Sequence, residues 1–89
     1  MNIKRTLNDV GSKVFIDFFE LFNSSLENSE VEERLPAKYT EKSRKSRTNK
    51  ARSIIKKGYV LDALEYILNS KRMDFETKEK AKNIKNSLL

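Results

Sequence analysis

The 89-residue chain contains no cysteine and no histidine, and it has only two glycines and one proline. Without cysteine it can form neither a disulfide nor a thiolate metal site, and without histidine it lacks the side chain that most often acts as a general acid or base. Zinc-finger and histidine-based catalytic mechanisms are therefore excluded. The chain also has no glycine-rich phosphate loop and no convergent set of carboxylates. We expect no enzyme activity, no metal, no cofactor and no small-molecule substrate.

No stretch of the chain is both long and continuously apolar. The longest apolar cluster runs from Val14 to Phe22 and is interrupted by Asp17 and Glu20, whereas a membrane-spanning helix needs about 20 apolar residues in succession. The N-terminus lacks the apolar region and the small-residue cleavage site of a secretory signal. We therefore expect a cytoplasmic protein with no membrane partner.

The charge of the chain is positive and unevenly distributed. Its net charge is +6 over 89 residues, which we interpret as one domain, 1–89. Residues 1–33 hold three basic and seven acidic groups, a net charge of −4, and residues 34–89 hold sixteen basic and six acidic groups, a net charge of +10. This division predicts a basic binding face beside an acidic remainder, or two halves that attract each other.

Residues 4–26 are predicted to form one apolar N-terminal helix. Apolar side chains recur along it in steps of three and four from Ile3 to Leu21. A second stripe beside the first consists of Phe15, Phe18, Phe19 and Phe22. One helix face cannot hold both stripes, so we expect the phenylalanines to fill a core, and the same four side chains are our candidates for a homodimer or partner interface. Gly11 is a point at which the helix could start late or bend.

Residues 27–39 are predicted to be an acidic connection. A short helical turn over residues 30–35 is stopped by Pro36, because the residue before a proline is pushed out of the helical region. The segment carries the glutamates Glu27, Glu30, Glu32 and Glu33. We expect these carboxylates to be solvated and not catalytic.

A basic helix is predicted over residues 40–57. From Thr40 to Lys50 the chain has no apolar side chain, five basic residues and one acidic residue. Thr40 is a suitable N-cap, and Gly58 suits the left-handed position that follows a helix C-terminus. Ala51, Ile54 and Ile55 define the buried side, so the apolar stripe occupies only the C-terminal half and we expect the N-terminal half to contribute nothing to the core.

Opposite that buried side lies a polar ridge with helical spacing. Its members are Lys42, Lys45, Asn49, Arg52 and Lys56. The ridge is either a solvated face of a lysine-rich chain or a nucleic-acid contact, with the cations on phosphates and Asn49 near a base edge. Arg44 and Arg47 either extend this contact surface or pair with the acidic segment 27–33, and charge slightly favours the pairing.

Two further helices are predicted over residues 59–69 and 75–88. Asp74 is the N-cap of the second, and its apolar face consists of Phe75, Ala81, Ile84 and Leu88. Residues 58–67, which include Gly58 and Ala63, are similar to the turn and second helix of a tetratricopeptide unit. The resemblance occurs once, whereas a solenoid needs about three repeats, so it implies helix-hairpin packing. The predicted fold is all-α: a small bundle of about four helices. It has a C-terminal three-helix unit over 40–89, compatible with a helix-turn-helix arrangement, and a Phe-rich N-terminal helix that covers this unit or pairs with a second copy.

These features favour a small DNA-binding protein, a regulator or accessory factor, that docks helix 40–57 on a nucleic-acid groove, with RNA as the next target. The hydroxyl and amide groups among the cations favour groove contact over a purely electrostatic tail. The alternative is a protein-interaction module or dimeric adaptor that uses the Phe-rich segment 14–22 and binds no nucleic acid.

Overall fold

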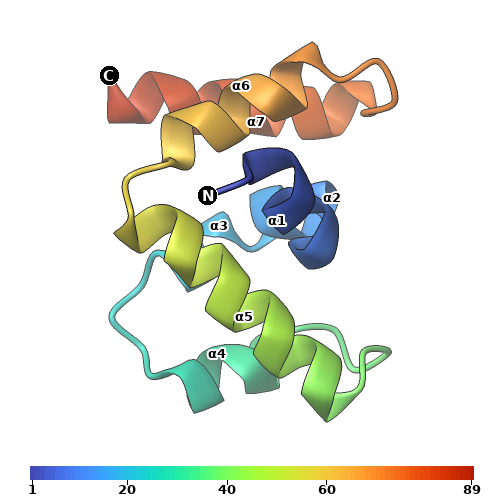
Figure 1. The fold of residues 1–89 in the computed structure, drawn as a ribbon, viewed down its shortest axis with the longest axis vertical. Helices are drawn as coiled ribbons and strands as arrows, with labels where there is room; N and C mark the ends of the chain where they lie inside the picture. The colour runs from blue at the N-terminus through green and yellow to red at the C-terminus, as the bar shows by residue number, and fades with distance from the viewer.

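The computed structural model describes all 89 residues and contains only helices and their connections (Figure 1). The helices are α1 (Ile3–Val10), α2 (Ser12–Asp17), α3 (Phe19–Phe22), α4 (Asn28–Arg34), α5 (Glu41–Lys56), α6 (Val60–Asn69) and α7 (Phe75–Leu88). The predicted small all-α bundle is confirmed. The predictions for the three C-terminal helices agree with the structure to within a residue or two, whereas the N-terminal helix differs.

The N-terminal segment is three short helices, so the prediction of one continuous helix over residues 4–26 is wrong. Gly11 separates α1 from α2 with backbone angles of φ 91° and ψ 116°, a conformation that a residue with a Cβ atom rarely adopts. Phe18, at φ −112° and ψ 20°, separates α2 from α3. The two bends turn the segment back on itself, which lets both of its apolar stripes reach partners.

This folded N-terminal segment occupies the middle of the molecule. It lies between the pair α4 and α5 on one side and the hairpin of α6 and α7 on the other (Figure 1). Helix α1 packs on both α5 and α6, and α2 packs on α7. The arrangement differs from the expected three-helix C-terminal unit, because α5 packs mainly on α1 and α4.

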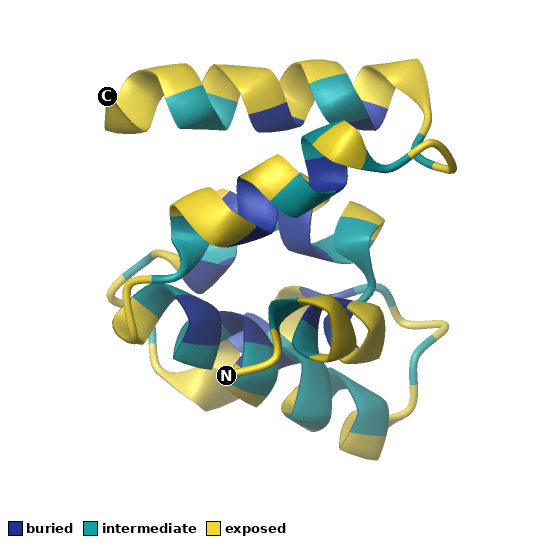
Figure 2. Ribbon diagram, turned by 45° about the horizontal axis from the view of Figure 1, so that its top comes forward, coloured by how far each residue is buried: buried dark blue, intermediate teal, exposed yellow.

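One hydrophobic core joins all of these layers (Figure 2). Its buried apolar residues are Leu7, Val10, Phe15, Ile16, Phe19, Phe22, Val31, Leu35, Ala51, Ile54, Ala63, Leu64, Ile67 and Ala81. The Phe15 and Phe19 rings meet edge to face with their centres 5.7 Å apart, an arrangement that aromatic pairs prefer. Almost half of the core side chains come from residues 7–22, so the fold depends on the N-terminal segment.

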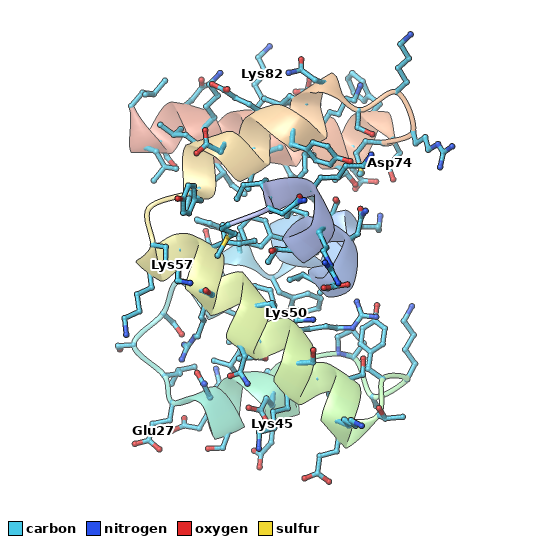
Figure 3. All side chains as sticks on the ribbon, in the orientation of Figure 1. Glu27, Lys45, Lys50, Lys57, Asp74 and Lys82 are labelled. Carbon is cyan, nitrogen blue, oxygen red and sulfur yellow. The ribbon has the colours of Figure 1, made fainter.

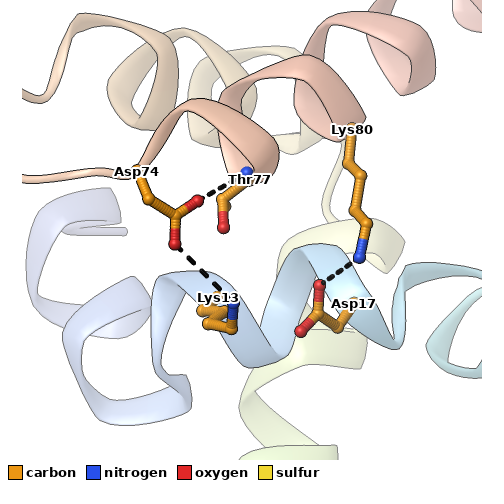
Figure 4. A network of polar contacts seen from close by, with 5 residues as sticks. All are labelled: Lys13, Asp17, Asp74, Thr77 and Lys80. Atoms are coloured by element: carbon orange, nitrogen blue, oxygen red, sulfur yellow. Dashed lines mark hydrogen bonds and ion pairs between the residues drawn. The ribbon is translucent and has the colours of Figure 1, made fainter.

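Two ion pairs join α2 to α7, and α2 supplies the cation in one pair and the anion in the other (Figure 4). Lys13 Nζ lies 3.6 Å from Asp74 Oδ2, and Lys80 Nζ lies 3.1 Å from Asp17 Oδ1. Lys13 and Asp17 are one helical turn apart on α2, so each presents its charge to the same side of the helix. Together the pairs connect α2 to the N-cap residue and the second turn of α7.

Helix α7 begins as its sequence predicts but leaves one large apolar side chain in solvent. The Asp74 side chain caps the helix by accepting a 2.6 Å hydrogen bond from the backbone N–H of Thr77. Phe75, which the helical spacing places on the apolar face, is 77% exposed. It lies at the first helical position, where the chain has not yet reached the core, and the buried face of α7 starts at Thr77 and continues at Ala81.

Candidate nucleic-acid interface

The basic helix α5 forms where the sequence predicts it and is capped at both ends. The hydroxyl of Thr40 accepts a 3.1 Å hydrogen bond from the backbone N–H of Ser43, and this bond satisfies a donor that the first helical turn leaves free. The helix ends at Lys56, and Gly58 adopts a φ of 81°. Both predicted helix signals are therefore confirmed.

The buried side of α5 extends further toward its N-terminus than predicted. Ala51 and Ile54 are fully buried, as expected, and Ile55 is half-buried. Thr48 is also fully buried, and its hydroxyl has no hydrogen-bond partner. The expectation that the N-terminal half contributes nothing to the core is wrong, because α4 packs on α5 and lies beside Arg44 in that half of the helix.

Three lysines of the predicted ridge lie on the exposed side of α5. Lys42, Lys45 and Lys56 are exposed, and none has a carboxylate oxygen within 4.0 Å. Figure 3 shows Lys45 near the end of α5 that lies over α4, and Lys57 at the opposite end of the helix. These ammonium groups are free to meet an external anion.

The ridge residue Arg52 has a different role, since its guanidinium group turns onto the chain itself. Its Nε donates a 3.1 Å hydrogen bond to the carbonyl of Phe22, its Nη1 a 2.7 Å bond to Asn28 Oδ1, and its Nη2 a 3.2 Å bond to the carbonyl of Ser24. The carbonyls of Phe22 and Ser24 belong to the end of α3 and the connection that follows it. Arg52 therefore ties α3 and α4 to α5.

Asn49 lies beside Arg52 on the same ridge and is partly engaged. Its side-chain oxygen accepts a 3.1 Å hydrogen bond from Asn28 Nδ2. The side chain is exposed, and its own amide N–H groups make no hydrogen bond within the chain. Asn49 can therefore still donate to an acceptor on a ligand.

Arg47 also points into the molecule, away from the ridge. Its Nη1 donates to the carbonyl of Val10, the last residue of α1, and its Nε donates a 3.0 Å bond to the Ser43 hydroxyl. The guanidinium carbon lies 4.1 Å from the centre of the Tyr39 ring, within the range of a cation–π contact. Arg47 thus neutralises the negative end of α1 and pairs with no glutamate of segment 27–33.

Arg44 lies on the side of α5 that faces α4. It borders a hollow together with Glu32, Glu33 and Glu41, so the structure places it beside the acidic segment. No carboxylate oxygen comes within 4.0 Å of it, and its buried Nε has no hydrogen-bond partner. Arg44 is thus adjacent to the glutamates without a direct ion pair.

The structure gathers the N-terminal part of the ridge around one shallow hollow on α5. The hollow has a volume of about 310 Å³ and is lined by Lys42, Lys45, Ser46, Asn49 and Lys50. No carboxylate lines it. At its edge, Lys50 Nζ lies 3.0 Å from Asp9 Oδ2 of α1. Lys56 is separate from this group and borders another hollow, with Arg52.

The candidate interface residues of the Phe-rich segment divide into two kinds. Phe15, Phe19 and Phe22 are buried within the chain, and Phe18 is half-buried. In the folded single chain only Phe18 therefore presents apolar surface, because the bends at Gly11 and Phe18 turn the other three rings inward. The core interpretation accounts for those three rings, and pairing with a second copy stays a prediction.

A second basic surface involves residues that the sequence does not bring together. Where the α1–α2 junction, the connection before α5 and the α6–α7 connection meet, an open cleft of about 760 Å³ carries five cations and no carboxylate: Lys4, Lys13, Arg47, Lys71 and Arg72. These cations come from four distant parts of the chain. No spacing or motif could have indicated them, since only the tertiary fold makes them neighbours.

Asp74 and Lys80, which form the ion pairs with α2, have shifted pKa values. The hydroxyl and then the backbone N–H of Thr77 lower the pKa of Asp74, although only the N–H donates with regular geometry, and Lys13 adds to the effect. The hydrogen bond to Asp17 and the negative charge of Asp17 raise the pKa of Lys80. Both shifts favour the charged forms and so maintain the two ion pairs between α2 and α7.

Comparison of the chain with protein-family models, curated proteins and solved structures found no match. None of the seven helices combines the length and apolar character that crossing a bilayer requires. No group of three or more acidic side chains is arranged to hold a metal ion. The function must therefore be argued from the surfaces of the chain itself.

Proposed function

We propose that this protein binds nucleic acid, with DNA as the favoured target, through the exposed face of α5. The observation that carries this proposal is the hollow on α5, where Lys42 and Lys45 have no ion-pair partner and stand beside the polar side chains of Ser46 and Asn49. Unpaired ammonium groups neutralise phosphates, and hydroxyl and amide groups donate to phosphate or base-edge acceptors.

The contact surface is smaller than the whole ridge. Arg47 and Arg52 are engaged with backbone carbonyls of the chain, and releasing them would cost the hydrogen bonds that hold α1 and α3. The proposed contacts are therefore Lys42, Lys45 and Lys56 to phosphates and Asn49 to a base edge. Each lysine that neutralises a phosphate of B-DNA contributes about −0.9 to the slope of log affinity against log salt.

The test is a fluorescence-anisotropy titration of the full chain against labelled duplex DNA, single-stranded DNA and duplex RNA at several salt concentrations. We expect a slope of about −3 for the preferred duplex, which corresponds to three neutralised phosphates. Lys45→Glu should weaken binding by at least about tenfold and make the slope shallower. No binding to any of the three nucleic acids at low salt would overturn the proposal.

Lys82→Glu is the matched control for Lys45→Glu. Lys82 is exposed, has no ion-pair partner and lies on α7 at the opposite end of the molecule from Lys45 (Figure 3). Both variants change the net charge by the same amount. Equal losses in the two variants would mean that net charge alone drives binding and that α5 is not the contact surface.

The alternative, a protein-interaction module that uses segment 14–22, has weaker support. Three of its four phenylalanines are already buried in the chain, so a partner could reach them only if the fold opened. A homodimer would rest on Phe18 and its surroundings. Analytical ultracentrifugation over a wide concentration range, with Phe18→Asp for comparison, tests this prediction. Localisation in the cytoplasm also stays a prediction.

A further inference from the structure

The largest cleft of the molecule lies on a different face from the hollow on α5. It is lined by residues of the connection before α5, of the α1–α2 junction and of the α6–α7 connection. Figure 1 shows these three parts of the backbone on its right-hand side. Its volume of about 760 Å³ falls within the range of cavities that bind small organic ligands. None of the proposed nucleic-acid contacts of α5 lines it.

The charge of this cleft selects an anion. Five cations line it and no carboxylate does. Lys13 is paired with Asp74 at 3.6 Å, and Arg47 is occupied by the carbonyl of Val10. Lys4, Lys71 and Arg72 have no ion-pair partner. These three uncompensated cations repel one another across the cleft, and a phosphate bound among them would relieve that repulsion.

The rest of the lining selects a ligand with a flat, partly apolar body. Tyr66, Met73 and Val14 supply apolar surface, and the Tyr39 ring is covered by Arg47. No cation of the chain lies over the ring of Tyr66, and this half-buried side chain borders the cleft. Asn8 also lines the cleft and carries amide groups that can bond to the edge of a heterocycle. A lone phosphate would leave most of these groups without a contact.

We infer that this cleft binds a nucleotide unit, with the phosphate on Lys4, Lys71 and Arg72 and the base against Tyr66 and Met73. Stacking of a base on an aromatic side chain contributes about 1–3 kcal/mol and tolerates different bases. The unit could be a free nucleotide or the terminal nucleotide of a strand, because the recognised chemistry is the same. The inference goes beyond the α5 proposal and does not depend on it.

The test is a ¹H–¹⁵N NMR titration of the full chain at low salt with adenosine monophosphate, adenosine and inorganic phosphate in separate samples. We expect adenosine monophosphate to shift the backbone amide signals of Gly11, Ser12, Ser70 and Lys71, which border the cleft. Adenosine and inorganic phosphate should each bind at least about tenfold more weakly. Absence of these shifts at millimolar adenosine monophosphate, or equal affinity for phosphate alone, overturns the inference.

Arg72→Glu and Lys82→Glu form the matched pair of variants. Both residues are exposed and unpaired, and only Arg72 lines the cleft. Arg72→Glu should lower the affinity for adenosine monophosphate by at least about tenfold, whereas Lys82→Glu should change this affinity by about twofold or less. Equal weakening in both variants would indicate non-specific attraction and overturn the site.

A short single strand with a 5′-phosphate separates the two sources of the nucleotide. If the strand binds more tightly than adenosine monophosphate and shifts the same amide signals, the cleft is a site for a strand end. If the strand binds equally tightly or more weakly, the cleft is a site for a free nucleotide. Lys45→Glu separates the two proposals: it should weaken duplex binding by at least about tenfold and leave the affinity for adenosine monophosphate unchanged. Loss of the latter in Lys45→Glu would place the nucleotide on α5 and contradict the cleft.

Discussion

Arg52 Nη1 donates a hydrogen bond of 2.7 Å to Asn28 Oδ1, although the two residues are 24 positions apart in the chain. Through its other nitrogens the same guanidinium group holds the carbonyls of Phe22 and Ser24. The three nitrogens of the planar group are spaced apart in a fixed fork, so they reach separate acceptors on α3, on the following connection and on α4, which the single nitrogen of an ammonium group cannot span. Arg52, which helical spacing places on the polar ridge, thus links α3 and α4 to α5 and stabilises the fold.

We expect Arg52→Lys to lower the free energy of unfolding by about 1–2 kcal/mol, because it loses most of these hydrogen bonds while keeping the charge. Urea denaturation monitored by circular dichroism measures the change. The control is the reverse substitution at an exposed ridge position without partners, Lys45→Arg, which should change stability by less than about 0.5 kcal/mol. An Arg52→Lys variant as stable as the original would show that these hydrogen bonds contribute little to the free energy of unfolding.

Gly11→Ala should lower the free energy of unfolding by about 1–3 kcal/mol, since the backbone there suits glycine only. The added Cβ atom would also lie 3.0 Å from Arg47 Nη1, displacing a group that bonds to Val10. Gly58→Ala is the comparison: its φ is also positive, but its Cβ would meet no atom within 4 Å. Gly58→Ala should lower the free energy of unfolding by less than Gly11→Ala does, by about 1 kcal/mol. Equal losses in thermal unfolding would argue against a role for the Arg47 contact.

Thr48→Val should raise the free energy of unfolding by about 1 kcal/mol. The Thr48 side chain is fully buried and its hydroxyl has no partner, so an apolar group of similar shape removes an uncompensated polar atom from the core. Thr6→Val at a half-buried position should have little effect. A destabilised Thr48→Val variant would mean that the hydroxyl has a hydrogen-bond partner in solution.

The Asp74 cap predicts a dependence of stability on pH. Its pKa is lowered from the usual 3.8 in the folded chain, so the carboxylate stabilises the fold above that pH, and this contribution is lost as the pH falls through the lower folded value. Asp74→Ala should therefore reduce the melting temperature at pH 6, with a difference from the original chain that shrinks below about pH 4. Glu79→Ala, at an exposed position on α7, should show no such pH dependence. A difference that is constant with pH would exclude the charge of Asp74 as its cause.

Local signals in the sequence predict those parts of the fold that local physics determines. The caps at Thr40 and Asp74 and the glycine at position 58 locate the bounds of α5 and α7, because each acts within a few residues of its own backbone. Gly11 was visible as a weak point for the same reason. The break at Phe18 was not, since no local signal opposes a helix there and the bend is favoured by packing of the rings on both sides.

The candidate site was predictable only in part, because helical spacing shows which residues share a face and not what lies across from it. Lys42 and Lys45 lie on the exposed side as the spacing indicates. Arg47 and Arg52 share the same basic composition, yet their partners are backbone carbonyls of Val10 and Phe22, which carry no sequence signature. The cleft cations carry no such signal, since Lys4 and Arg72 line one cleft only in the folded chain, where α1 and the α6–α7 connection border it.

The central position of residues 3–22 has a consequence for biosynthesis. A ribosome makes these residues before α5, α6 and α7, which supply the surfaces that enclose them. The segment therefore cannot reach its native packing when it is first synthesised. Until α5 has been synthesised, the rings of Phe15, Phe19 and Phe22 have few partners and are open to association with other nascent chains or with a chaperone. Folding of residues 3–22 thus follows the synthesis of the helices that enclose them.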